Sequence, residues 1–74
     1  MPLRNLAYAE IRRRLLALGF LEIGQRGSHV KFARRNGNGL ATVIVPKHRV
    51  VALGTLRSIL RQAGISADEF EAAE

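Results

Sequence analysis

Apolar residues near the start of the chain recur at intervals of three and four, which is the pattern of an amphipathic helix. Their positions are Ala7, Ile11, Leu15 and Leu18. Gly19 follows directly and is typical of the residue after a helix end, while Asn5 is a candidate N-cap. The pattern therefore predicts a first helix over residues 7–18.

Three segments in the middle of the chain have the character of β-strands. They span residues 20–25, 28–35 and 40–45. The first two alternate apolar with polar or small residues, and the third is rich in β-branched residues. Arg26-Gly27 and the run from Asn36 to Gly39 supply turns, and Pro46 ends the third strand. Strands joined by such short turns predict an antiparallel meander.

Helical spacing returns in the last third of the chain. The apolar positions there are Leu56, Ile59, Leu60 and Ala63. Thr55 is the predicted N-cap of this second helix, and Gly64 is its predicted end. Ser66 and Glu69 have the spacing of a capping box and predict a short third helix, which Phe70 would anchor.

The order of these elements, α-β-β-β-α, predicts a single α+β domain over residues 1–74. A three-stranded antiparallel sheet with both long helices on one face would bury the apolar stripes. The other sheet face would then stay open to solvent. His29 and Lys31 have the opposite parity to Val30 and Phe32, so we expect them on this open face.

Composition excludes several classes of protein. The chain has 74 residues and no cysteine, so it lacks a disulfide framework, a thiol nucleophile and a cysteine-ligated metal. Outside the acidic C-terminal end no two acidic residues lie close in sequence, which argues against metal-dependent or two-carboxylate hydrolysis. No apolar run approaches the roughly 18 residues of a membrane span, and no export leader is evident. We therefore expect a cytoplasmic protein without a membrane partner.

Charge narrows the class of partner. The net charge is +6, but all twelve Lys and Arg and only two of the six acids lie in residues 1–67. This part of the chain therefore carries +10, and the last seven residues carry −4. Such a basic body favours a polyanionic partner through steering and counterion release. Charge alone fits RNA, DNA, an anionic lipid or an acidic protein.

His29 is the strongest candidate for chemistry. It follows Gly27 and Ser28 and is flanked by Arg26 and Lys31. A histidine titrates near neutral pH and can act as general base or acid toward a ribose hydroxyl. The alternative is an exposed strand histidine without a role.

Three other features are weaker candidates. His48 is either a phosphate contact, a second acid–base group or a loop residue that bonds the backbone, and Arg49 beside it is an electrostatic contact. The start of the second helix at Gly54-Thr55 offers backbone N–H groups to a phosphate, with Arg57 on an exposed side. The alternative there is a capped helix with a solvated arginine.

Three segments together resemble the HicA toxins, also called YcfA-like proteins. They are Gln25-Arg26-Gly27-Ser28-His29, Val45-Pro46-Lys47-His48 and the segment from Gly54 to Ser66. The resemblance implies an mRNA interferase of a toxin–antitoxin pair, which cleaves RNA without a metal or cofactor and is neutralised by a HicB-type antitoxin. It also implies a double-stranded-RNA-binding-like fold. His29 would be the catalytic residue, and Gly27 and Ser28 would position it.

These observations lead to one hypothesis for the reaction. His29 takes the proton of a ribose 2′-hydroxyl, and the oxygen attacks the adjacent phosphate while Arg26 and Lys31 stabilise the developing charge. His48, a lysine or water would protonate the leaving oxygen. The predicted RNA contacts are Arg26, Gly27, Ser28, Lys31, Lys47, His48, Arg49, Thr55 and Arg57. The alternatives are a non-catalytic RNA-binding module of the same fold and a protein that acts by docking an antitoxin.

Overall fold

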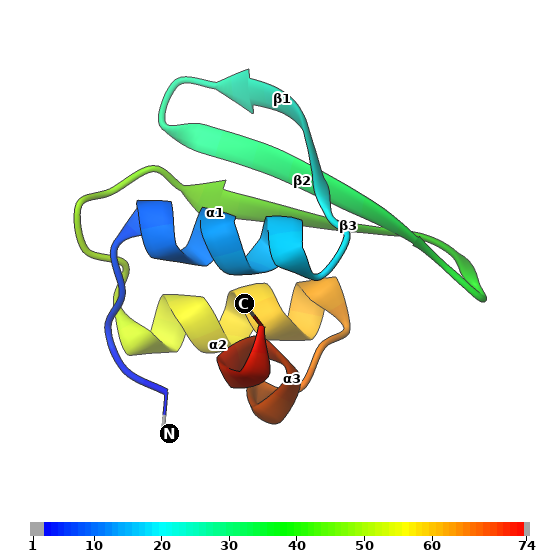
Figure 1. Ribbon diagram of the computed structural model, residues 1–74. Helices are drawn as coiled ribbons and strands as arrows, with labels where there is room; N and C mark the ends of the chain where they lie inside the picture. The colour runs from blue at the N-terminus through cyan, green and yellow to red at the C-terminus, as the bar shows by residue number, and fades with distance from the viewer. Residues whose placement is uncertain (1–2, 74) are drawn as a thin grey trace.

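The chain folds as a helix, three strands and two further helices in the computed structural model, which describes residues 3–73 (Figure 1). The elements are α1 (Tyr8–Ala17), β1 (Leu21–Arg26), β2 (His29–Asn36), β3 (Gly39–Pro46), α2 (Leu53–Ala63) and α3 (Ala67–Ala72). This is the predicted α+β layout of α-β-β-β-α with a final short helix, and the prediction is confirmed.

The strands form one antiparallel sheet in the order β1-β2-β3, with β2 in the centre. Helices α1 and α2 lie on the same side of this sheet (Figure 1). Val30 and Phe32 of β2 point into the layer between sheet and helices and are fully buried. His29 and Lys31 alternate with them and are exposed, as strand parity predicts. Within residues 3–73 no element covers the face on which His29 and Lys31 lie.

The start of α1 differs from the sequence prediction. Its N-cap is Ala7, which is exposed and makes no side-chain cap. Tyr8 takes the position in the apolar stripe that was assigned to Ala7, and only 9% of its surface is exposed. Asn5 does not cap this helix. Its Oδ1 accepts a hydrogen bond of 2.8 Å from the backbone N–H of Leu53, the first residue of α2.

Helix α2 begins three residues earlier than predicted. Its N-cap is Ala52, and Thr55 lies exposed inside the first turn, so the prediction of Thr55 as N-cap is wrong. A tertiary contact explains where α2 begins. Leu6 and Val51 exchange backbone hydrogen bonds of 3.1 and 2.6 Å, which brings Asn5 to the helix start and replaces a local cap.

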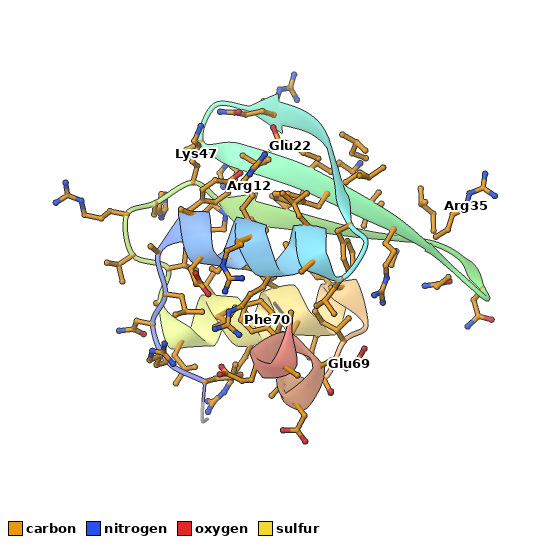
Figure 2. The ribbon with its side chains drawn as sticks, in the orientation of Figure 1. Arg12, Glu22, Arg35, Lys47, Glu69 and Phe70 are labelled. Atoms are coloured by element: carbon orange, nitrogen blue, oxygen red, sulfur yellow. The ribbon has the colours of Figure 1, made fainter. Side chains whose placement is uncertain are left out.

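Helix α3 begins where the capping box predicts. Ser66 Oγ accepts from the Glu69 N–H at 3.0 Å, and Glu69 Oε1 accepts from the Ser66 N–H at 3.1 Å. Phe70 is fully buried and holds the helix against the core (Figure 2). Arg14 of α1 donates from Nη1 to the carbonyl oxygens of Phe70 and Glu71, both at 2.9 Å. The end of α3 is therefore fastened to α1.

Candidate nucleic-acid interface

A tight turn positions His29 as the first residue of the central strand. Arg26 pairs with His29 directly across this turn, which consists of Gly27 and Ser28 and so lies one residue later than predicted. Gly27 adopts a φ of 58°, a left-handed conformation that glycine takes without steric cost. The Gln25 side chain donates to the Gly27 carbonyl oxygen at 3.0 Å. Because directly paired residues project to the same side of a sheet, Arg26 and His29 share the open face.

The next positions on this face are also set by strand register. Pro46 of β3 lies opposite His29, and Lys31 lies between Gly24 of β1 and Ile44 of β3. Gly24 carries no side chain, and a Cβ built there would meet nothing within 4 Å. The surface beside His29 and Lys31 is therefore cationic and sterically open.

A β-bulge in β1 decides which of its side chains reach the open face. The register shifts between Glu22 and Gly24, so Leu21 and Arg26 lie on the same face although they are an odd number of residues apart. Glu22 faces the helices instead, where its Oε1 lies 3.4 Å from Arg12 Nε (Figure 2). Strand alternation without a bulge would place Arg26 on the opposite face from Leu21.

The three residues after β3 lie apart from this arrangement. Lys47, His48 and Arg49 are exposed and, with Ala7, Tyr8 and Ala9, line a shallow hollow at the start of α1. The backbone carbonyl of His48 accepts from the Tyr8 N–H at 3.2 Å. Lys47 Nζ lies 5.9 Å from the centroid of the Tyr8 ring.

One backbone hydrogen bond joins the residues around His29 to the connector after β3. The Lys47 N–H donates to the Ser28 carbonyl oxygen at 2.6 Å, so the connector after β3 is tied to the turn that carries His29. Burial raises the pKa of Tyr8, and the nearby Glu22 carboxylate raises it further.

Thr55 and Arg57 lie in the helix layer. Both are exposed residues of α2, and α2 packs on the side of the sheet opposite to His29 (Figure 1). The structure thus gathers Arg26, Gly27, Ser28, His29 and Lys31 at one end of the open face. It places the remaining predicted RNA contacts in the connector and in α2.

Comparison with protein families decides the identity of this fold. The model described as "HicA toxin of bacterial toxin-antitoxin" matches residues 8–65. The chain belongs to the HicA toxin family. No curated protein matches it at a significant level.

The HicA match extends from the first residue of α1 to Ile65, directly before the Ser66 cap of α3. It includes the whole sheet and the turn that carries His29. As a HicA-family toxin, the chain is one component of a toxin–antitoxin system and has an antitoxin partner. Among residues 3–73 no three His, Asp or Glu side chains lie close enough to hold a metal ion together. In the same part of the chain no helix is long and apolar enough to cross a membrane.

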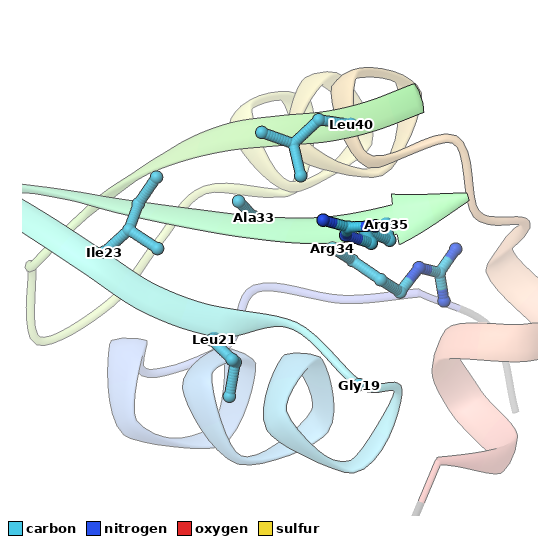
Figure 3. A pocket seen from close by; sticks show the side chains of 7 residues that line it. All are labelled: Gly19, Leu21, Ile23, Ala33, Arg34, Arg35 and Leu40. Carbon is cyan, nitrogen blue, oxygen red and sulfur yellow. The ribbon is translucent and has the colours of Figure 1, made fainter. Parts of the chain in front are cut away.

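Sequence reasoning missed one part of the HicA open face. Leu21, Ile23 and Leu40 have 67%, 53% and 62% of their surface exposed. With Ala33 they line a hollow at the end of the sheet away from His29 (Figure 3). The parity of Leu40 relative to the buried Val43 and Val45 would have assigned it to the open face. No local signal would have placed it beside Leu21.

Proposed function

We propose that this HicA-family chain is an endoribonuclease that cleaves mRNA with His29 as general base and without a metal or small-molecule cofactor. It acts in the cytoplasm, and a HicB-type antitoxin neutralises it. One observation supports the proposal most strongly. His29 is exposed at the head of the central strand, beside Arg26 on the neighbouring strand and two residues from Lys31, on a face that no described element covers.

The geometry suits attack by a ribose hydroxyl on its own phosphate. A neutral His29 imidazole accepts the proton of the 2′-hydroxyl, and the oxygen forms a bond to the adjacent phosphorus. The bond from phosphorus to the 5′-oxygen breaks, and this oxygen takes up a proton. The products are a 2′,3′-cyclic phosphate and a 5′-hydroxyl, so atoms and charge balance without an oxidant or a metal.

Arg26 and Lys31 supply the electrostatic part of this reaction. Lys31 stands two residues along β2, roughly 7 Å from His29 at the usual rise per residue. Negative charge on the phosphate oxygens grows as the transition state forms. Cations fixed on the same face stabilise it more strongly than they stabilise the ground state.

The test is replacement of His29 by alanine. We expect His29→Ala to bind RNA but to cleave it at least about 100-fold more slowly, the usual contribution of a general base. Because His29 is exposed, the melting temperature should not change. Thr42→Ala is the matched control, since Thr42 is an exposed β3 residue on the same face without a role in the reaction. Cleavage is measured on a labelled RNA, with end-group analysis for the cyclic phosphate.

Three other outcomes would contradict parts of this proposal. Full cleavage by His29→Ala contradicts the assignment of the base. Binding without cleavage by the wild-type chain shows a non-catalytic RNA-binding module instead. Strong inhibition by EDTA shows a metal-dependent enzyme.

A further inference from the structure

The open face carries an apolar corner, which consists of Leu21, Ile23, Ala33 and Leu40. These residues come from three neighbouring strands (Figure 3). Ala33 is 7% exposed and forms the floor, whereas the two leucines and Ile23 are each more than half exposed. They border a hollow of about 430 Å³. Contiguous large aliphatic side chains on a small soluble domain are typical of an interaction surface, whereas isolated ones are ordinary.

The chemistry of this corner fits a protein and not RNA. Its side chains are aliphatic, so they offer no hydrogen-bond donor to a phosphate and no aromatic ring on which a base could stack. Leucine and isoleucine gain free energy when they are removed from water against other apolar side chains. The occupant therefore presents apolar side chains of its own.

The border of the corner indicates the charge of the occupant. Arg34 and Arg35 line the same hollow. Arg34 is engaged within the fold, since its Nη1 donates to the Leu18 carbonyl at 3.0 Å and its guanidinium lies 4.6 Å from the centroid of the Phe20 ring. Arg35 is exposed, and no carboxylate among residues 3–73 forms an ion pair with it. Lys31 continues the basic border toward His29.

We propose that the antitoxin partner docks on the apolar corner through a segment with apolar side chains flanked by carboxylates. The apolar side chains fill the hollow, and the carboxylates pair with Arg35 and Lys31. Ala33 lies four residues from His29 along β2, roughly 13 Å at the usual rise per residue. The residues that hold the antitoxin are therefore distinct from the residue that cleaves RNA, although a segment that extends over Lys31 also blocks His29.

That the chain has an antitoxin partner follows from its membership of the HicA family. Only the RNA-cleavage measurement in the test below rests on the proposed function. The test compares Leu21→Ser and Leu40→Ser with Val50→Ser. Val50 is the matched control, because it is 58% exposed but lies in the connector between β3 and α2. The antitoxin is produced from the reading frame adjacent to that of this chain, and its affinity is measured by calorimetry. These titrations use the His29→Ala background, which avoids toxicity during expression.

We expect Leu21→Ser and Leu40→Ser each to weaken antitoxin binding about tenfold, the effect of exposing one buried leucine. Val50→Ser should bind as the parent does. All three variants should keep the parental melting temperature, because the replaced side chains are exposed. RNA cleavage by the same variants with His29 present, made by cell-free synthesis, should stay within twofold of wild type.

Three results overturn the inference. Unchanged antitoxin affinity in both leucine variants shows that the corner is not the docking site. A parallel loss of RNA binding in these variants assigns the corner to RNA. Wild-type dimers that Leu40→Ser converts to monomers in analytical ultracentrifugation, with antitoxin affinity unchanged, assign it to a second copy of the chain. If the wild-type chain cleaves no RNA, the proposed function fails while the calorimetric comparison still decides this inference.

Discussion

The carboxylate of Glu10 accepts hydrogen bonds from two arginines of α1. Arg13 donates to it from Nε and Nη2 at 3.1 and 2.6 Å, and Arg14 donates from Nε at 2.8 Å. The hydrogen bonds from Arg13 and then from Arg14 lower the pKa of Glu10 from 4.5 to about 2. Arg14 in turn holds the last carbonyls of α3 and lies 5.3 Å from the centroid of the Phe70 ring. A single acidic side chain thus supports the contact between the first and last helices.

This geometry predicts a pH dependence of stability. A depressed pKa in the folded state means that the stabilisation is complete above pH 4.5 and is lost as the pH falls toward about 2. Glu10→Gln should lower the free energy of unfolding at pH 7 by about 1 kcal/mol, the range of partly exposed ion pairs. It should also flatten the stability profile between these two pH values.

Urea unfolding followed by circular dichroism measures both effects. Glu71→Gln is the control, because its side chain forms no ion pair among the described residues. Its effect should stay within about 0.5 kcal/mol, as for most surface substitutions. Equal pH profiles of Glu10→Gln and the parent chain would contradict the role of this carboxylate.

At the scale of elements, the segment before α1 acts on a helix that is far away in sequence. Asn5 accepts from the Leu53 N–H, and the bridge between Leu6 and Val51 holds the two segments together. Helix α2 has no side-chain cap from its own N-cap residue. The N-terminal segment therefore completes α2 and fixes the connector that carries Lys47 and His48.

Asn5→Ala should lower the free energy of unfolding by about 1 kcal/mol, the usual value of a lost N-cap. Hydrogen exchange at Leu53 should become faster, because its amide loses its partner. Arg4→Ala is the control, since Arg4 is an exposed neighbour in the same segment. An unchanged exchange rate at Leu53 in Asn5→Ala would show that water replaces the cap without cost.

For the molecule as a whole, charge is divided between the two layers. The acidic residues Asp68, Glu69 and Glu71 lie in α3 of the helix layer, whereas Arg26, Lys31 and Arg35 lie on the open face. Figure 2 shows Glu69 and Arg35 far apart on the two layers. A polyanion approaching the open face therefore meets mainly cations. The net charge of +6 understates the positive potential at the open face, because it sums the charges of both layers.

RNA binding should consequently depend steeply on salt. If the three cations of the open face each neutralise one phosphate, affinity should fall about 20-fold between 50 and 200 mM salt, with a slope of roughly −0.7 per contact on single-stranded RNA. Antitoxin binding to the apolar corner should fall less, because salt screens its ion pairs with Arg35 and Lys31 but not its apolar contacts. Fluorescence anisotropy and calorimetry over this range measure the two slopes. RNA affinity that is flat over this range would show that charge is not the main source of binding.

Much of the fold could be predicted from local signals. Helical spacing, strand alternation and short turns determined the order of the elements, and the parity of β2 placed His29 and Lys31 on the open face. The starts of α1 and α2 were wrong because their caps depend on contacts between residues 5–6 and 51–53. Roles for His29 and the other site residues remain predictions, since geometry alone places these groups without assigning a reaction.

The sequence by itself determined the layers of this protein, the face that stays open and the histidine at its edge, because each follows from the periodicity of neighbouring residues. Only the tertiary structure decided that Arg26 stands beside His29 on the face that also carries Leu21, because this depends on a bulge in β1. Only the register of three strands brought Leu21, Ala33 and Leu40 into one apolar corner. Such neighbourhoods arise from pairing between distant segments, and no local pattern encodes them.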